Sequence, residues 1–167
     1  MIRRVSPGEA DDALSIVREA AAWADAQGIA VWTPDELRIE TFAAAARKSE
    51  LVIGYAGQVA AATMLLQAED PLYWPDEPRG SALYLHKVAV RRRYAGQSWL
   101  TRLIHFAADD ALRSGIRRLR LDTVLRPKLS SMYERHGFRV LAEPPIIVAG
   151  RQMIRLERIL DSGSGDR

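Results

Sequence analysis

The stretch that decides the fold is Val90-Arg91-Arg92-Arg93-Tyr94-Ala95-Gly96-Gln97-Ser98. Before it, residues 82–90 form a densely apolar run that is typical of a buried strand. After it, residues 98–114 repeat apolar side chains at helical spacing, which predicts an amphipathic helix. Residues 117–123 predict another strand. A strand, a turn, a helix and a second strand make a βαβ crossover.

The turn itself has the composition of an anion site. The first amide groups of a helix have no partner inside the helix, and they carry the positive end of its dipole. A pyrophosphate placed there meets several donors, and the small residues Gly96 and Ser98 let it approach the backbone. The alternative interpretation is an ordinary turn with a solvated run of arginines. A GxxxxGK[ST] loop is absent, and so are the spaced glycines of a dinucleotide site.

The rest of the chain predicts a mixed sheet. Residues 1–5 indicate a first strand, and two capping boxes, 6–9 and 33–36, each open a helix. Later in the chain, residues 51–66 predict a hairpin, 67–80 a polar loop and 127–136 a short helix. Residues 138–141 and 151–159 predict the two last strands. We therefore expect an α/β (α+β) fold: one domain over residues 1–160, with about four helices and a mixed, mostly antiparallel sheet of seven strands. Residues 161–167 should form a disordered tail.

Composition excludes several classes of site. The chain has 167 residues, a net charge of +3 and no cysteine, so disulfides, zinc–thiolate sites and cysteine nucleophiles are excluded, and we expect no metal. No apolar run reaches the roughly 20 residues of a membrane span, and the first residues show no secretory pattern. We expect a cytoplasmic protein without a membrane partner. The modest net charge also disfavours a nucleic-acid partner.

The motifs, taken in order, resemble one family. Arg93-Tyr94-Ala95-Gly96-Gln97-Ser98 is similar to the Arg/Gln-x-x-Gly-x-Gly/Ala signature of the GCN5-related N-acetyltransferase (GNAT) family. Three further segments are similar to parts of the family. Residues 85–90 resemble the strand beside the pantetheine arm, and residues 120–122 resemble the end of the fifth strand. Residues 129–138 resemble the Tyr-Glu-x-x-Gly-Phe segment. The resemblance covers roughly residues 54–138, and the connector near Trp32 is similar to that of bacterial members. Two positions depart from the pattern: Ser98 replaces the usual glycine or alanine, and Arg126-Pro127 stand where many members have an asparagine that touches the cofactor.

The resemblance implies a GNAT fold and acetyl-CoA or coenzyme A as the cofactor. It implies that the backbone N–H groups of Val88 and Val90 bind the pantetheine arm and polarise the thioester carbonyl. The cofactor contacts expected in full are Val88, Ala89, Val90, Arg91, Arg93, Tyr94, Ala95, Gly96, Gln97, Ser98 and Arg126.

The implied reaction is the attack of a neutral amine on a thioester. Tyr133 is the expected donor of a proton to the departing thiolate, because a phenol of pKa about 10 is protonated at neutral pH. The alternative is a tyrosine that only packs the short helix on the sheet. For the general base, His86, Asp122 and a water chain remain open.

The acceptor is expected to be the primary amine of a small molecule. The loop 67–80 combines carboxylates with aromatic rings, which suits a cationic amine, and we expect Trp32, Trp74 and Asp76 to contact it. The alternative for this loop is a solvated acidic segment, and for the tryptophans ordinary core packing. A polyamine, an amino-acid derivative and an amino-modified antibiotic all fit, and a protein or peptide amine stays open.

Two rival functions remain. One is a regulatory module that binds acyl-CoA without catalysis, and the other is a nucleic-acid-binding domain that uses the arginines at 91–93, 117, 118 and 120. Pairing of the last strand between subunits would give a homodimer.

Overall fold

The computed structural model describes residues 1–161 of the chain. These residues form two compact units. The first contains residues 1–66 and 86–104, and the second contains residues 67–85 and the chain from residue 105 onward. Each unit is described by itself below.

The first unit begins with β1 (Ile2–Arg4), α1 (Ala10–Ala26) and α2 (Ile39–Arg47). Both predicted capping boxes are confirmed: Glu9 accepts from the backbone and hydroxyl of Ser6, and Glu36 accepts from those of Thr33. Each box, however, opens a short 3₁₀ turn, and the α-helix starts only after it, so that α2 begins three residues beyond Glu36. Tertiary contacts therefore decide where the longer helices start.

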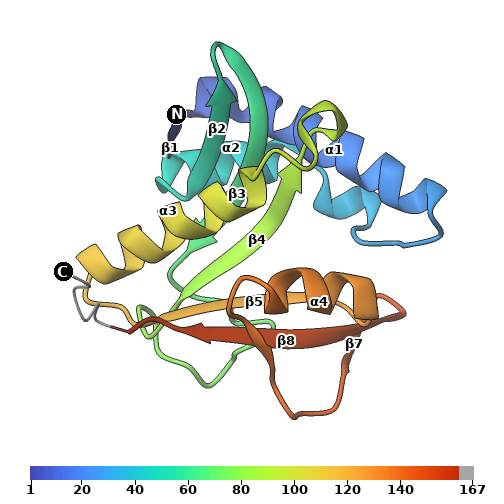
Figure 1. The fold of residues 1–167 in the computed structure, drawn as a ribbon, viewed down its shortest axis with the longest axis vertical. Helices are drawn as coiled ribbons and strands as arrows, with labels where there is room; N and C mark the ends of the chain where they lie inside the picture. The colour runs from blue at the N-terminus through green and yellow to red at the C-terminus, as the bar shows by residue number, and fades with distance from the viewer. Residues whose placement is uncertain (162–167) are drawn as a thin grey trace. The chain divides into compact units, whose positions relative to one another are not determined.

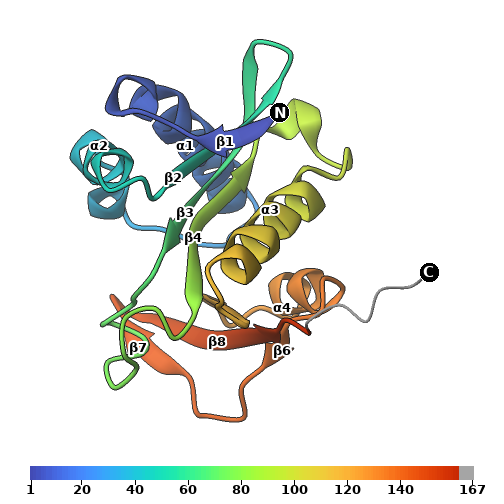
Figure 2. The ribbon, with the colours of Figure 1, turned by 90° about the vertical axis from the view of Figure 1, so that its left-hand side faces the viewer.

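Three antiparallel strands continue this unit. β1 pairs with β2 (Leu51–Ala56), β2 pairs with β3 (Val59–Gln67), and β3 neighbours β4 (Leu83–Val90). Figure 2 shows α1 and α2 on one face of these strands and the start of α3 (Trp99–Arg113) on the other. The core on the α1/α2 side is apolar, with Ile16, Phe42, Leu51 and Ile53 fully buried.

The face toward α3 depends on one glycine. A Cβ atom on Gly54 would lie 2.8 Å from Cζ3 of Trp99, which is closer than real side chains approach. Trp99 is itself buried at the first position of α3. The start of α3 can therefore lie this close to β2 because residue 54 has no side chain.

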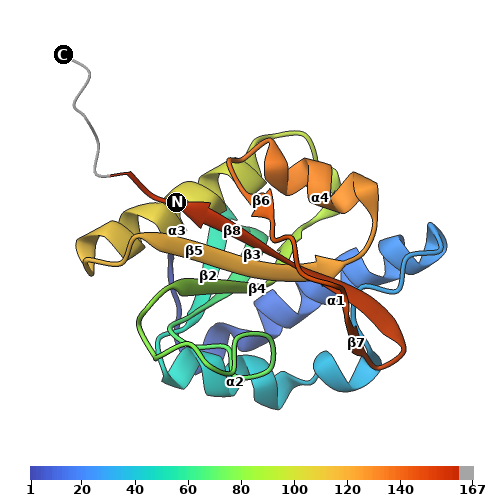
Figure 3. The ribbon, with the colours of Figure 1, turned by 90° about the horizontal axis from the view of Figure 1, so that it is seen from below.

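The second unit is built around β5 and β8. The first half of β4 pairs in parallel with β5 (Arg118–Val124), for example Leu83 with Leu119, which confirms the predicted crossover. β5 pairs with β8 (Arg151–Ile159) along its whole length, and β8 also pairs with β6 (Arg139–Val140) and β7 (Ile146–Val148). In Figure 3, α4 (Pro127–Glu134) lies over β5 and β8 beside β6.

The predicted fold class is confirmed, with one correction to the strand count. Residues 1–161 contain four α-helices and eight strands, not seven, in the order β1-β2-β3-β4-β5-β8-β6 with β7 on β8 (Figure 1). The additional strand, β7, has three residues and follows Pro144-Pro145. Within this part of the chain no helix is both long and apolar enough to cross a membrane. Of the predicted tail, residues 161–167, all but Asp161 lie outside the described residues.

Candidate functional site

The turn between β4 and α3 has the backbone that an anion site requires. Residues Arg92–Tyr94 form a 3₁₀ turn, and Gly96 and Ser98 then adopt positive φ angles of 76° and 61°. α3 starts at Trp99, one residue later than predicted. The left-handed residues turn the chain sharply into the helix, whose first N–H groups have no partner inside it. Several donors and the positive end of the helix dipole therefore meet at this corner.

The side chain of Arg91 is already bound by neighbouring parts of the first unit. Its Nε donates to the carbonyl of Ala60 (2.8 Å), Nη1 to Glu19 (2.9 Å) and Nη2 to the hydroxyl of Ser15 (3.1 Å). Its guanidinium is thus held by β3 and α1. Arg91 stays a predicted cofactor contact, but its side chain has built-in partners on this unit.

The other two arginines of the turn are exposed and rest on aromatic rings. Arg92 lies over Trp23 of α1, with its guanidinium carbon 3.9 Å from the ring centre. Arg93 lies over Tyr94 at 4.9 Å. The side chain of Gln97 closes the turn by donating to the carbonyl of Arg93 (3.1 Å). Trp23 of α1 therefore contacts the predicted cofactor turn.

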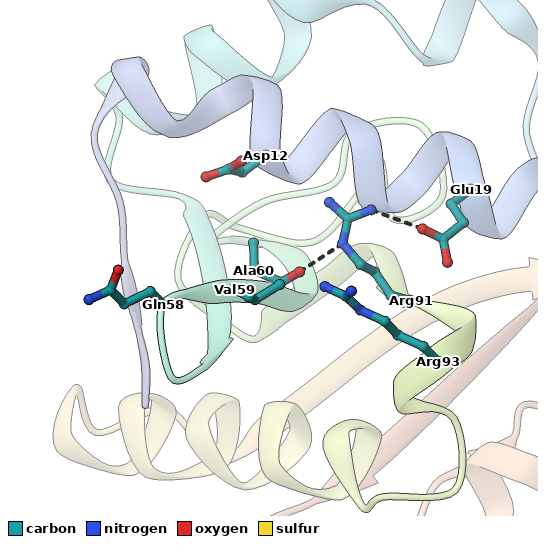
Figure 4. Close-up of a pocket in the computed structure, with 7 residues that line it drawn as sticks. All are labelled: Asp12, Glu19, Gln58, Val59, Ala60, Arg91 and Arg93. Atoms are coloured by element: carbon teal, nitrogen blue, oxygen red, sulfur yellow. Dashed lines mark hydrogen bonds and ion pairs between the residues drawn. The ribbon is translucent and has the colours of Figure 1, made fainter.

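A pocket of about 430 Å³ opens beside this turn, within the first unit. Arg91 and Arg93 enter it from the turn and extend toward β3 (Figure 4). The remaining lining residues are Asp12, Glu19, Gln58, Val59 and Ala60. Both signs of charge therefore meet in the pocket, and Glu19 already pairs with Arg91.

The strand that leads into the turn is distorted at Lys87. This residue has a φ of 50° inside β4, a left-handed conformation that interrupts the regular strand as β-bulges do. Its ammonium pairs with Glu36 (2.9 Å) and lies 5.7 Å from the ring centre of Trp32. His86, Val88 and Val90 around it are half-buried and Ala89 is buried. The left-handed Lys87 thus sits among the residues that the sequence assigned to catalysis and cofactor binding.

The second unit holds Tyr133 and Asp122. Tyr133 is 8% exposed on α4 and packs edge-on against Phe138, with ring centres 5.9 Å apart. Burial, and after it the negative charge of Asp122, raises the pKa of the Tyr133 phenol above its usual range. The phenol is therefore protonated at neutral pH. Arg126, at the N-cap of α4, is exposed.

The loop between β3 and β4 is solvated only in part. Asp70, Tyr73 and Trp74 are buried, whereas Leu72 and Asp76 are exposed. Asp70 accepts from the backbone N–H groups of Leu72 (3.2 Å) and Tyr73 (3.1 Å), which fixes the first turn of the loop. The solvated acidic segment that the sequence left open as the alternative therefore describes the exposed residues of the loop, but not its three buried side chains.

Two arginines of the second unit hold this loop. Arg120 of β5 is 5% exposed, pairs with Glu77 of the loop (3.1 Å) and Glu157 of β8 (2.9 Å), and donates to the hydroxyl of Tyr84 (3.2 Å). The guanidinium carbons of Arg120 and Arg155 lie 5.6 and 5.8 Å from the ring centre of Trp74, and Arg155 donates to the carbonyl of Tyr73 (2.8 Å). Trp74 is only 6% exposed, so little of its ring is available to an acceptor.

The structure distributes the predicted residues over both units. The first unit contains His86, Trp32 and the segment 88–98. The second unit contains Asp122, Tyr133, Arg126, Trp74 and Asp76. Sequence reasoning missed Glu19, Arg155 and the role of Arg120. The contacts described above for these residues span 36 to 82 residues of the chain, where local spacing gives no signal.

A family model for the acetyltransferase (GNAT) family matches residues 16–138, which include β4, the turn, α3, β5 and Tyr133. The chain belongs to the GNAT acetyltransferase family. The uncharacterised N-acetyltransferase YesJ of Bacillus subtilis (strain 168) is 35% identical over 88 residues, which are 50% of this chain and 49% of YesJ. The chain thus matches about half the length of this GNAT relative.

Solved GNAT structures share the fold over nearly the whole chain. An acetyltransferase of the GNAT family from Listeria monocytogenes superimposes with a TM-score of 0.75 at 19% identity, covering 96% of this chain and 94% of its own. The PaiA N-acetyltransferase from Thermoplasma acidophilum, solved in complex with coenzyme A, gives 0.74 at 14% identity, covering 95% and 98%. Rv2747 from Mycobacterium tuberculosis, solved with CoA and NLQ, gives 0.66 at 13% identity, covering 96% and 99%. At such low identity these likenesses show the fold alone.

Proposed function

We propose that this GNAT protein transfers an acetyl group from acetyl-CoA to the primary amine of a small molecule, by direct attack of the amine on the thioester. The observation that carries the proposal is the turn after β4, where two left-handed residues, Gly96 and Ser98, lead into the first turn of α3, the positive end of the helix dipole. The coenzyme A found in the PaiA and Rv2747 structures supports the same ligand for this turn.

Binding of the diphosphate would depend mainly on backbone groups. The amides at the start of α3 supply oriented donors, and the exposed Arg93 can add a charge-assisted hydrogen bond. Val88 and Val90, which follow the left-handed Lys87, are our candidates for the backbone groups that meet the pantetheine arm. Arg126, exposed at the N-cap of α4, stays a candidate for a further contact.

The chemistry would use one acid and one base. The amine nitrogen forms a bond to the acyl carbon while the carbon–sulfur bond breaks. Tyr133 gives its proton to the sulfur, and the raised pKa of its phenol keeps that proton in place until the reaction needs it. The proton of the amine passes to His86, Asp122 or a water molecule. Acetyl-CoA supplies the activated acyl group.

Two measurements test the proposal. Calorimetry with coenzyme A should show binding, and acetyl-CoA mixed with single amines should release free thiol. The amine panel contains a polyamine, an amino-acid amide, an aminoglycoside and a short peptide with a free N-terminus. Thiol release with a small amine supports the proposal, and release with the peptide alone makes the protein a peptide acetyltransferase. Binding without release would identify a regulatory module, and no binding would overturn the assignment.

A further inference from the structure

Glu19 of α1 contacts the turn with both of its carboxylate oxygens. Oε2 accepts from Nη1 of Arg91 (2.9 Å; Figure 4), and Oε1 accepts from the backbone N–H of Arg92 (2.8 Å). One side chain thus fixes both a charge and a peptide group of the turn. Burial opposes ionisation, but the hydrogen bonds from Arg92 and Arg91 outweigh it and lower the pKa of Glu19. The carboxylate is therefore ionised at neutral pH, and both contacts are charge-assisted.

Two neighbours of Glu19 on the helix contact the same turn. Ser15 accepts from Nη2 of Arg91 (3.1 Å), and Trp23 lies under the guanidinium of Arg92 at 3.9 Å. Residues 15, 19 and 23 are spaced four apart, so they form one stripe along a face of α1. The stripe contacts Arg91 and Arg92, the first two residues of the turn, ahead of its two left-handed residues. Arg91 is fixed from a further side by β3, through the carbonyl of Ala60.

We propose that this stripe of Ser15, Glu19 and Trp23 holds the β4–α3 turn in the conformation that receives the diphosphate of coenzyme A, with Glu19 as its main positioning residue. The inference rests on the proposed function of the turn. A turn that is already ordered loses less conformational entropy when it binds a ligand, so affinity falls when the stripe is broken. Glu19 acts through the turn and does not need to touch the cofactor.

The decisive variant is Glu19→Gln. The amide oxygen can still accept from Arg92, but the amide NH₂ then faces the donors of Arg91, and the negative charge is lost. We expect the Kd for coenzyme A, measured by calorimetry, to rise about tenfold, in the range that a lost charge-assisted hydrogen bond allows. The Tm should change little, because the Glu19 side chain is 36% exposed beside an open pocket and its replacement leaves no buried void.

The matched control is Asp25→Asn. Asp25 is an exposed carboxylate on the same helix, so this variant removes the same charge from α1 without touching the turn. Its affinity for coenzyme A should equal that of the wild type. A role of Glu19 in folding alone would lower the Tm and leave the Kd for coenzyme A unchanged. The KM for the amine shows whether the variant also affects binding of the acceptor.

A double-mutant cycle tests the route. If Glu19 acts through Arg91, the losses of affinity in Glu19→Ala and Arg91→Ala should not add in the double variant. Should the Glu19 variants fail to fold, Trp23→Leu replaces them, since Trp23 is 37% exposed, and a several-fold loss of affinity is expected. Unchanged affinity in a folded stripe variant overturns the inference. Absence of coenzyme A binding in the wild type instead overturns the proposed function.

Discussion

Arg91, Arg92 and Arg93 are identical and consecutive, yet the structure gives each a different environment. Arg91 is bound to Glu19, Ser15 and the carbonyl of Ala60, Arg92 lies on Trp23, and Arg93 lies on Tyr94. Sequence reasoning treated the run as a store of positive charge for a phosphate. It could not separate the three residues, because the partners of Arg91 and Arg92 are distant in the chain and only that of Arg93 is its neighbour.

Tyr133 gives the sharpest prediction for catalysis. Tyr133→Phe keeps the ring and its edge contact with Phe138 but removes the proton that the leaving thiolate needs. We expect kcat to fall about 100-fold, as for the loss of a general acid, while the Kd for coenzyme A stays within twofold of the wild type, roughly 0.4 kcal/mol. Steady-state kinetics and calorimetry measure the two quantities. An unchanged kcat would remove Tyr133 from the reaction and leave it as a packing residue.

Gly54 gives a prediction for stability. Gly54→Ala would place a methyl group 2.8 Å from Cζ3 of Trp99 and 3.3 Å from Cγ1 of Ile2, so we expect a loss of about 1–3 kcal/mol of unfolding free energy. Gly8→Ala is the control, because Gly8 is exposed and its nearest neighbour, the Ser6 hydroxyl, lies 3.9 Å from the new methyl. Urea denaturation of both variants decides the matter. Equal stabilities would mean that α3 can shift away from β2 at no cost.

At the scale of elements, the strands and helices with strong periodicity were predictable, and the irregular ones were not. β8 was predicted at its observed bounds, and α3, β4 and β5 to within a residue or so, because each combines a clear apolar pattern with a turn residue at its end. β7 was missed, since three residues carry no periodic signal. The burial of Tyr73 and Trp74 in the loop 67–80 was missed because Arg120 and Arg155, which hold the loop, lie far along the chain.

The ion pair between Glu77 and Arg120 should control how tightly that loop is held. Glu77→Gln removes the charge that pairs with the buried Arg120, so we expect the loop amides of Trp74 and Gly80 to exchange hydrogen about fivefold faster, or about 1 kcal/mol. Glu69→Gln is the control, because the pair of Glu69 with Arg79 lies on the same loop but is well exposed. Equal protection in both variants would show that Trp74 and Arg155 hold the loop without Glu77.

At the scale of the whole molecule, several carboxylates are tied to arginines in both units. Arg3 lowers the pKa of Glu9 to about 2, and arginine partners, working against burial, also lower the pKa values of Glu19 and Glu157. For Glu77, the hydrogen bond from Arg120 lowers the pKa directly. Such groups bind protons more readily in the unfolded chain, so the stability they give is present above about pH 4.5 and is lost as the pH falls.

Acid should therefore lower the free energy of unfolding by an amount that can be assigned to these carboxylates. We expect the unfolding free energy to be flat from pH 7 to about pH 5 and to fall steeply toward pH 3, measured by urea denaturation at fixed temperature. Glu9→Gln should reduce the fall between pH 5 and pH 3 by about 1 kcal/mol, since the pair with Arg3 is partly exposed. A fall of unchanged size in this variant would exclude Glu9 as a source of the acid sensitivity.

The family could be identified from sequence because the order of its motifs survives in the chain: the strand, the basic turn, the helix, the next strand and the Tyr-Glu segment all lie within the matched residues 16–138. The order of the motifs could not predict which side chains contact each other within each unit. Glu19 lies 72 residues from Arg91, and Arg120 lies 43 residues from Glu77. Those contacts exist only once the chain has folded.

The binding of Arg91 to α1 has a consequence for how an anion would be captured at the turn. Dissolved salt screens exposed charges beyond about 8 Å at physiological ionic strength, but it weakens short, directional bonds from peptide groups far less. Because the charge of Arg91 is already neutralised by Glu19, the corner relies more on its peptide groups than three consecutive arginines suggest. Ligand capture there should accordingly depend less on ionic strength than capture by three free arginines would.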